Sequence, residues 1–250
     1  MTGELWCADW TTWRAEELGA RHFWPIDLPR EVPSEVAVWV PGQTAAQWRH
    51  EAGDGAPVLR SLGRDWPAHV PGGLDVTPRK VLTWSGALRG LWTEPMFVKL
   101  ADAKDERFPA KVRTRGETVR DLREAGGFTE LIVAPVREYV REVRVFYSTR
   151  GASASVYREV SGGRERFYDG GEVLSPGDFA VPEGFAPGTV WDFGQSPQGR
   201  WEVIEYNAAW SSAWYGCDLG VVRQALRDAR DSDMPLWSPD AITVRGVRKC

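Results

Sequence analysis

The sequence predicts an α+β fold, in which antiparallel sheets are combined with a few separate helices. Residues 142–157 and 189–206 each contain two strand-like stretches around a turn, and each is predicted to form a hairpin. Residues 116–127 and 219–230 are predicted helices, because the first ends in Gly-Gly and the second is amphipathic. Hairpins together with separate helices are typical of the α+β class.

Length and composition indicate a globular protein. The chain has 250 residues, enough for one large domain or two small ones with a sizeable core. Hydrophobic residues make up 42% and charged residues 26%, so we expect a folded rather than a disordered chain. The net charge of −4 does not imply a broad nucleic-acid surface, and we expect no nucleic-acid partner.

The sequence gives no sign of a membrane or secretory segment. No apolar run is long enough to span a bilayer, and the first ten residues lack the pattern of a signal peptide. Cys7, Cys217 and Cys250 are far apart and odd in number, which indicates a reducing compartment. The three histidines are isolated, so no structural zinc site is expected. We therefore expect a cytoplasmic protein that has no membrane partner.

The rest of the chain is predicted to form short elements and loops. Before Pro78 the sequence is loosely organised, with a strand at 35–42, a short helix at 44–52 and loops from 53 to 78. After Pro78, apolar residues recur at helical spacing and predict a helix; they are Val81, Trp84, Leu88 and Leu91. The remaining predictions are strands at 96–100 and 130–136, a charged loop at 101–110 and a long covering loop at 161–188.

Three oxygen-bearing side chains in the second hairpin predict a metal site. Glu205 and Asn207 are two positions apart in one strand, so they share a face. Asp192 in the preceding strand can lie opposite or diagonal to Glu205 on that face. Carboxylates that repel each other in a half-buried place favour a neutralising cation, and hard oxygen ligands suit magnesium with a nucleotide. The alternative is that Asp192 caps a turn and Glu205 pairs with a surface arginine.

Several basic residues before this hairpin suit a phosphate. Lys99 lies in a short apolar strand, where its charge is costly unless it reaches an anion; the alternative is an edge strand facing water. Glu142 and Arg144 share one face of the first hairpin. Arg144 could clamp a phosphate or carboxylate and Glu142 could accept bonds from ribose, or the two could make cross-strand ion pairs. The loop at 101–110, with Lys104, follows Lys99 directly, where a lid over phosphates would lie.

The order of these elements resembles an ATP-grasp enzyme over roughly residues 78 to 230. The resemblance lies in the segments "FVKL", "ADAKDERFPA", "GETVRDLREAG", "ELIVAPV", "REVRVFY", "VWDFG" and "VIEYNAAW". More narrowly, the chain resembles the small bacterial and phage ATP-grasp clade that is named for one arginine and two lysines. This resemblance implies an N-terminal lobe at 1–77 and an ATP-grasp domain at 78–250. That domain would hold the nucleotide between antiparallel-sheet lobes at 78–136 and 137–250.

The resemblance also implies a role for each site residue. Lys99 would contact the nucleotide phosphates, and Arg144 would face the transferring phosphoryl group or the substrate carboxylate. Hinge backbone groups from Ala134 to Val136 would line adenine. Glu142 would hold ribose. The magnesium ligands would be Asp192, Glu205 and Asn207.

The chain also departs from the pattern of the clade. Leu100 replaces the proline expected after the lysine, and the following loop has no Gly-rich segment. Val190 stands where many relatives carry an arginine, so Arg144 would do that work. The second phosphate lysine is ambiguous: Lys104 is our choice, and Lys80 and Lys111 are alternatives.

The resemblance implies an ATP-dependent ligase that joins a carboxylate to an amine through an acyl phosphate, with ATP and Mg²⁺ as cofactors. The expected substrate is an amino acid, a peptide or a protein tail. The sequence shows no Ser/His/Asp or Cys/His constellation, which agrees with a mechanism that needs no side-chain nucleophile. Two alternatives stay open: a phosphotransferase on the same fold, and a non-catalytic nucleotide-binding module. The sequence does not identify the substrates, the role of residues 1–77 or the oligomeric state.

Overall fold

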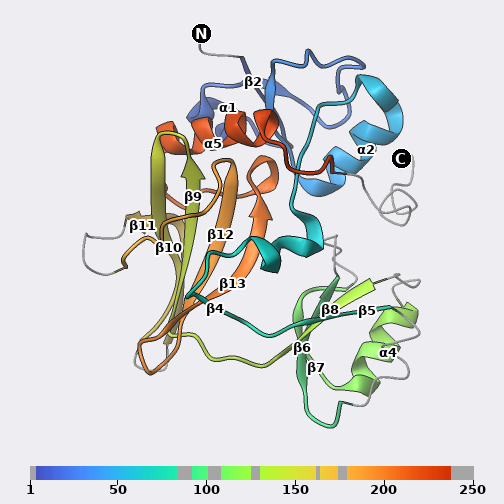
Figure 1. The fold of residues 1–250 in the computed structure, drawn as a ribbon. Helices are drawn as coiled ribbons and strands as arrows, with labels where there is room; N and C mark the ends of the chain where they lie inside the picture. The colour runs from blue at the N-terminus through green and yellow to red at the C-terminus, as the bar shows by residue number, and fades with distance from the viewer. Residues whose placement is uncertain are drawn as a thin grey trace. The chain divides into compact units, whose positions relative to one another are not determined.

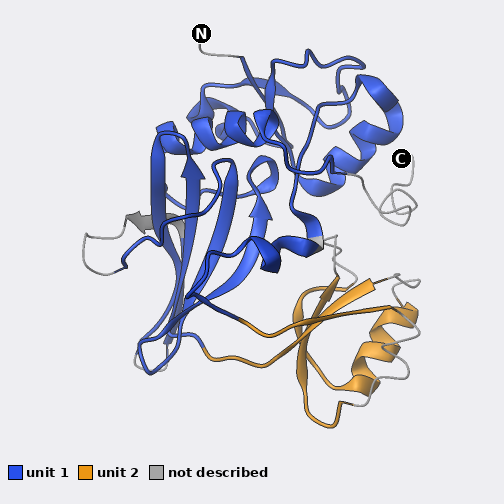
Figure 2. Cartoon of the chain, viewed as in Figure 1, with its two compact units in different colours: residues 1–76, 139–238 blue, residues 77–138, 239–250 orange. Residues whose placement is uncertain are grey.

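The structure, a computed structural model, describes residues 4–83, 92–100, 108–124, 130–161, 164–173 and 179–237. Lys104 and most of the predicted helix after Pro78, including Trp84, lie outside these residues. The described chain forms two compact units, which are coloured separately in Figure 2. The first unit combines the stretches 4–76 and 139–237, and the second lies within residues 77–138. Among the described helices, none has the length and apolar character needed to cross a membrane.

The first unit begins with a small parallel sheet of order β2-β1-β3. Its strands are β1 (Leu5–Ala8), β2 (Arg21–Phe23) and β3 (Ala37–Trp39), and its helices are α1 (Trp13–Leu18) and α2 (Gly42–Ala52). The predicted strand at 35–42 and helix at 44–52 are therefore present. The prediction of loose organisation before Pro78 was wrong for β1 and β2. All of β1 is buried, so it lacks the polar alternation that marks a half-buried strand, and β2 is only three residues long.

The main sheet of the first unit has six strands in the order β11-β10-β9-β12-β13-β4 (Figure 1). The predicted hairpins are confirmed as β9 (Arg141–Ser148) with β10 (Gly151–Ser161), and β12 (Thr189–Gln195) with β13 (Trp201–Ala208). The short β4 (Asp75–Val76) pairs in parallel with β13. Part of the predicted covering loop at 161–188 is instead β11 (Arg164–Val173), which extends the sheet by pairing with β10.

Helix α5 (Leu219–Asp231) packs against β9 and lies across one end of the strands in Figure 1. Asp218 caps it, since the Asp218 Oδ1 atom accepts a bond from the Val221 backbone N–H at 2.9 Å. Its apolar stripe is buried and joins a single core that includes residues from both halves of the first unit. Short 3₁₀ turns at Gly53–Gly55 and Gly63–His69 lie in the predicted loop region.

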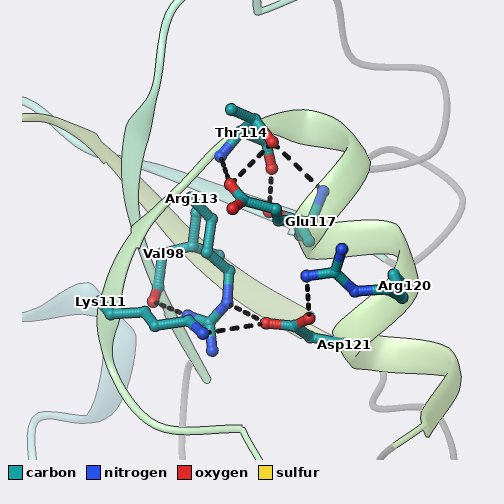
Figure 3. A network of polar contacts seen from close by, with 8 residues as sticks. Val98, Lys111, Arg113, Thr114, Glu117, Arg120 and Asp121 are labelled. Atoms are coloured by element: carbon teal, nitrogen blue, oxygen red, sulfur yellow. Dashed lines mark hydrogen bonds and ion pairs between the residues drawn. The ribbon is translucent and has the colours of Figure 1, made fainter.

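The second unit is a four-stranded antiparallel sheet of order β5-β8-β6-β7 with one helix described, α4. The elements are β5 (Lys80–Thr83), β6 (Met96–Leu100), β7 (Lys111–Arg113), α4 (Arg115–Glu124) and β8 (Glu130–Pro135). The helix predicted after Pro78 is wrong for residues 80–83, because these residues pair along their whole length with β8. Thr114 and Glu117 form a reciprocal capping box at the start of α4 (Figure 3), with bonds of 2.7 Å and 3.3 Å.

Candidate functional site

The charged residues predicted for the metal hairpin form one row across three strands of the main sheet. Arg144 of β9 lies opposite Asp192 of β12, and Asp192 lies opposite Glu205 of β13. Directly opposed residues of antiparallel strands share a face, so the three side chains project to the same side. A bulge between Asp192 and Phe193 sets this register. Asp192 was expected to lie opposite or diagonal to Glu205, and the structure shows it directly opposite.

Arg144 and Asp192 form a buried two-pronged ion pair at the centre of this row. The Arg144 Nε–Asp192 Oδ1 and Arg144 Nη2–Asp192 Oδ2 distances are both 2.8 Å, and the residues are 7% and 2% exposed. Burial by itself lowers the pKa of Arg144, but the charge and hydrogen bonds of Asp192 raise it above its ordinary value. Arg144 therefore balances the charge of Asp192 within the chain. Sequence reasoning had assigned this neutralising role to a metal cation.

Asn207 completes the contacts of Asp192. The Asn207 Nδ2 atom donates to Asp192 Oδ2 at 2.9 Å. This bond uses the nitrogen of the amide, and the amide oxygen is the atom that could act as a metal ligand. Half-buried Glu205 adds a second carboxylate to the row. These are hard oxygen donors of the kind that Mg²⁺ prefers, and Asp192 keeps acceptor capacity beyond its three hydrogen bonds. The donor types present therefore fit a magnesium ion, and Asp192 is oriented by Arg144.

Glu142 makes a cross-strand ion pair, which the sequence had left open as an alternative, and its partner is Arg158 of β10. Arg158 Nη1 donates to Glu142 Oε1, and Tyr157 Oη donates to Glu142 Oε2, each at 2.6 Å. Burial first, and then the charges of Asp192 and Glu142, raise the pKa of Tyr157, so its hydroxyl stays protonated and donates. Sequence reasoning missed both partners because a bulge in β10 between Val156 and Arg158 changes which residues face Glu142.

An aromatic pair borders the arginine of this row. The rings of Tyr157 and Tyr215 stack at 5.1 Å, and the Arg144 guanidinium carbon lies 4.9 Å from the Tyr215 ring centre. Tyr215 has a φ of 45°, a left-handed conformation that a non-glycine residue rarely adopts. Its carbonyl accepts a bond from the Ser155 hydroxyl, and Arg144 Nη1 donates to the Ala213 carbonyl at 3.1 Å. Glu205 and Asn207 form an E-x-N motif, and Arg144 and Ser155 fix the loop that follows it.

The remaining predicted residues lie in the second unit. Lys99 is half-buried in β6, which lies between β8 and β7 in the sheet. Its own backbone position pairs with Ile132 of β8, whereas the ladder with β7 ends at Val98, so the phosphate contact of Lys99 stays a prediction. Ala134 is buried near the end of β8, opposite Phe97, and Val136 follows the strand and is exposed. Of the alternative phosphate lysines, Lys80 is exposed at the start of β5. Lys111 forms an ion pair with Asp121 at 3.3 Å.

A buried arginine that sequence reasoning missed supports the strand of Lys99 (Figure 3). Arg113 is 1% exposed, and its Nη1 atom donates to the carbonyl of Val98, the residue before Lys99, at 3.1 Å. Its Nε atom donates to Asp121 Oδ2 at 2.9 Å, which lowers the pKa of Asp121. The guanidinium also lies 3.9 Å from the ring centre of Phe108. Arg113 therefore ties β6 to α4 next to the predicted phosphate lysine.

Comparisons with known proteins identify the family. A family model for the ATP-grasp domain, the second family of the clade named for one arginine and two lysines, matches residues 83–225. A search of curated protein sequences found no match. The solved structure of D-cycloserine synthetase DcsG is similar with a TM-score of 0.57 and 14% identity, covering 92% of this chain and 99% of that chain.

Two further structures share the fold. The RimK domain ATP-grasp protein of Sphaerobacter thermophilus is similar with a TM-score of 0.52 and 13% identity, covering 90% of this chain and 98% of that chain. The ATP-grasp ligase PsnB is similar with a TM-score of 0.51 and 12% identity, covering 92% of this chain and all of that chain. These likenesses show the fold, and the family match spans more than half of the sequence. The chain belongs to this second ATP-grasp domain family of the arginine-and-two-lysine clade, as the arginine and E-x-N strands had indicated.

Proposed function

We propose that this protein is an ATP-dependent ligase that joins a carboxylate to an amine. The observation that carries the proposal is the row of Arg144, Asp192 and Glu205, with Asn207 beside it, in a chain of the ATP-grasp family. The similar structures of DcsG, a D-cycloserine synthetase, and of PsnB, an ATP-grasp ligase complexed with a minimal precursor, support this reaction class. They favour an amino acid or a peptide as the substrate.

The proposed reaction has two steps that balance without a side-chain nucleophile. A carboxylate oxygen of the substrate attacks the γ-phosphorus of ATP, which forms an acyl phosphate and releases ADP. The nitrogen of the amine then attacks the acyl carbon, phosphate leaves, and the nitrogen loses a proton to give the amide. The work of the protein is to position the reactants and to neutralise the charge on the transferred group.

Residues of the first unit would provide the charge at the transferred group. Glu205 and Asn207 would hold Mg²⁺, with Asp192 fixed beside them by Arg144. The ion, when bound, supplies positive charge to the phosphate oxygens. Arg144 is held in a fixed position, because Nε and Nη2 donate to Asp192 and Nη1 donates to the Ala213 carbonyl. From this position it would stabilise the transferring phosphoryl group or the substrate carboxylate. Glu142 would accept bonds from ribose in exchange for one of its present partners.

Residues of the second unit would bind the rest of the nucleotide. Lys99 would contact the phosphates, since its inner strand gives it a defined place. Lys104 would be the second phosphate lysine, and Lys80 and Lys111 are the alternatives. Backbone groups from Ala134 to Val136 would line adenine. These roles rest on the family and, for Lys99 and Ala134, on their places in β6 and β8; Lys104 lies outside the described residues.

The proposal is tested by magnesium-dependent ADP formation in the presence of pools of amino acids and peptides. Glu205→Gln and Asn207→Ala should each lower turnover by roughly a hundredfold, since one charge-stabilising contact is worth about 3 kcal/mol of the barrier. Glu202→Gln is the matched control, because it changes another half-buried glutamate of β13 outside the Asp192 row, and it should keep its activity. Full activity in either site variant would contradict the proposal.

Two measurements separate the alternatives. A phosphotransferase would release ADP without any amine, so turnover that does not depend on an amine would favour that reading. A non-catalytic module would bind ATP in calorimetry and release no ADP. Lys99→Ala should raise the nucleotide dissociation constant by about tenfold or more, because it removes a phosphate contact. An unchanged nucleotide dissociation constant in Lys99→Ala would contradict a phosphate contact by Lys99.

A further inference from the structure

A second cluster of polar and aromatic residues lies at the carboxyl ends of β1 and β3. In the sheet order β2-β1-β3, the chain goes from β1 to a neighbour on one side and then crosses to the other side. Open parallel sheets bind ligands outside the carboxyl ends of their strands, where the strand order switches in this way. Asp9 follows directly after β1, and Trp39 is the last residue of β3. The fold thus places these residues where such sheets hold ligands.

Arg14 occupies this switch point. Its guanidinium carbon lies 4.5 Å from the ring centre of Trp13 and 4.9 Å from that of Trp39. Its side chain is 27% exposed, and Trp13 is 45% exposed. The indole rings and the pairing with Asp9 hold the guanidinium in place, which reduces the entropy lost when a ligand binds to it.

The pairing of Arg14 with Asp9 uses one of its three nitrogens, Nη1, and its Nε atom is buried without a partner in the described part of the chain. Arg14 Nη1 donates to Asp9 Oδ2 at 2.5 Å, and this is its single hydrogen bond to any described residue. Asp9 also accepts bonds from the Trp10 backbone N–H at 2.8 Å and the Thr11 hydroxyl at 3.0 Å. The buried pair of Arg144 and Asp192, by contrast, uses two prongs. Asp9 is therefore satisfied while the guanidinium of Arg14 is not.

The loop after the E-x-N motif joins this cluster to the row of Arg144. The Trp214 ring lies 5.7 Å from that of Trp13 and 6.0 Å from that of Trp39. Trp39 Nε1 donates to the Ser212 carbonyl at 2.9 Å, while Arg144 Nη1 donates to the next carbonyl, that of Ala213. Consecutive residues of one loop thus contact the Arg14 cluster and the candidate catalytic row. A ligand at Arg14 would lie beside the loop that borders the proposed site.

We propose that Arg14 binds a carboxylate of the substrate that is recognised and not activated, such as the free carboxylate of an amino acid or a peptide end. A planar guanidinium with unused N–H donors matches the geometry of a carboxylate, and the exposed face of Trp13 suits the rest of an amino acid. That the ligand is a substrate rests on the proposed ligase function. Binding of a carboxylate at Arg14 is a property of the first unit and can be measured without ATP.

The test uses the full chain labelled with 5-fluorotryptophan and observed by ¹⁹F NMR in the absence of ATP. The Trp13 and Trp39 signals are assigned with Trp13→Phe and Trp39→Phe variants. The probes are the common amino acids, the corresponding amino acid amides and inorganic phosphate. We expect at least one amino acid to shift both signals, and its amide, which lacks the charged carboxylate, to bind about tenfold more weakly or worse.

Arg14→Lys should weaken binding of the amino acid by about tenfold or more. Lysine keeps the positive charge that pairs with Asp9 but lacks the planar guanidinium. Arg21→Lys is the matched control, since Arg21 also lies over aromatic rings of this sheet, at 5.0 Å from Phe23, but is not at the switch point. It should leave binding unchanged. If Arg14→Lys fails to fold, which the dispersion of the other tryptophan signals reveals, the comparison of acid with amide in the unaltered protein decides.

Three results would overturn the inference: no probe shifts the Trp13 signal, the amides or phosphate bind as tightly as the amino acids, or folded Arg14→Lys binds normally. ADP formation is measured separately on the same protein. Turnover without any carboxylate-dependent shift overturns the role of Arg14 and leaves the ligase proposal standing. A carboxylate-dependent shift without turnover supports Arg14 and contradicts the ligase proposal.

Discussion

At the scale of single residues, the buried ion pair of Arg144 and Asp192 makes each partner depend on the other. Removing one partner of a buried ion pair leaves the other charge uncompensated, so Arg144→Met should lower the free energy of unfolding by about 3–5 kcal/mol. The double variant Arg144→Met with Asp192→Leu should recover most of that loss, because no buried charge is left alone. Urea denaturation of the single and double variants measures both effects. Losses that simply add in the double variant would contradict this account.

A second residue-scale prediction concerns acid stability. The hydrogen bond from Arg113, followed by the contacts of Lys111 and Arg120, holds the pKa of Asp121 below its usual range. A lowered folded-state pKa gives stability that is present above the unfolded pKa, about 4, and is lost as the pH falls through the folded value. Asp121→Asn should therefore destabilise the protein by about 1–2 kcal/mol near neutral pH and by less near pH 3.

Urea denaturation at both pH values measures this difference in the free energy of unfolding. Asp54→Asn, at an exposed carboxylate of the first unit with no ion pair recorded in the described structure, is the control. It should have a small effect that is similar at each pH. A cost for Asp121→Asn that stays constant, or grows, as the pH falls would show that the carboxylate is not held in its charged form.

At the scale of elements, the approach of α5 to the start of β12 depends on one glycine. Gly188 has a φ of +82°, and a Cβ atom there would lie 2.4 Å from the backbone nitrogen of Ala229 in α5. Gly199 has nearly the same φ, +81°, with nothing within 4 Å. Alanine at Gly199 should cost about 1 kcal/mol for its backbone alone, whereas Gly188→Ala should cost at least about 2 kcal/mol more, because the helix must move.

The melting temperatures of Gly188→Ala and Gly199→Ala test this prediction. Because the two glycines have nearly the same φ, the backbone cost is the same in both variants and the difference reports the contact with α5. Equal melting temperatures would mean that α5 does not need the close contact. A larger loss for Gly188→Ala, with no change in the far-ultraviolet circular dichroism at low temperature, would locate the cost in the packing of α5 on the sheet.

The elements that the sequence predicted carry a local signal. The apolar residues of α5 recur about every 3.6 positions, because one side of the helix is buried. β9 and β12 are buried along most of their length, and their hairpins were predicted from strand-like runs on either side of a turn. The elements that the sequence missed lack such a signal. All of β1 is buried, β2 has three residues, and β5 is mostly exposed. Their pairing comes from neighbours that are distant in the sequence.

The candidate site divides in the same way. The shared face of Glu205 and Asn207 follows from strand geometry, and the facing position of Asp192 follows from the length of the hairpin. The contact between Arg144 and Asp192 joins residues 48 positions apart, and the sequence pattern of either strand does not contain it. The β10 bulge and the left-handed Tyr215 also escaped prediction, because each is set by tertiary contacts.

At the scale of the whole molecule, the first unit is built from two separated stretches of chain. We predicted lobes at 1–77, 78–136 and 137–250. The described residues of the first and third share one hydrophobic core, and the second lies between them in the sequence. Hydrogen bonds from backbone N–H groups join the two stretches of the first unit: the Val40 N–H donates to the Trp210 carbonyl at 2.7 Å. The Leu62 N–H donates to the Tyr206 hydroxyl at 3.1 Å.

A deletion tests this shared core. A chain of residues 77–250 should lose the cooperative unfolding transition of the first unit, because the strands and tryptophans of residues 4–76 supply part of its buried surface. Urea denaturation followed by near-ultraviolet circular dichroism compares this chain with the full one. A cooperative transition at the same midpoint in the shortened chain would show that residues 78–250 fold as an independent domain.

The insertion of the second unit also has a consequence for synthesis on the ribosome. Strands β1 to β3 and helices α1 and α2 emerge first, but the rest of the core that they share begins only at residue 139. At about 5–20 residues per second, translation of residues 77–138 takes roughly 3–12 s, during which the apolar residues that pack on the second stretch lack their final partners. Slower growth at low temperature or extra chaperone should therefore raise the yield of native protein, since nascent chains would aggregate less before their C-terminal partners arrive.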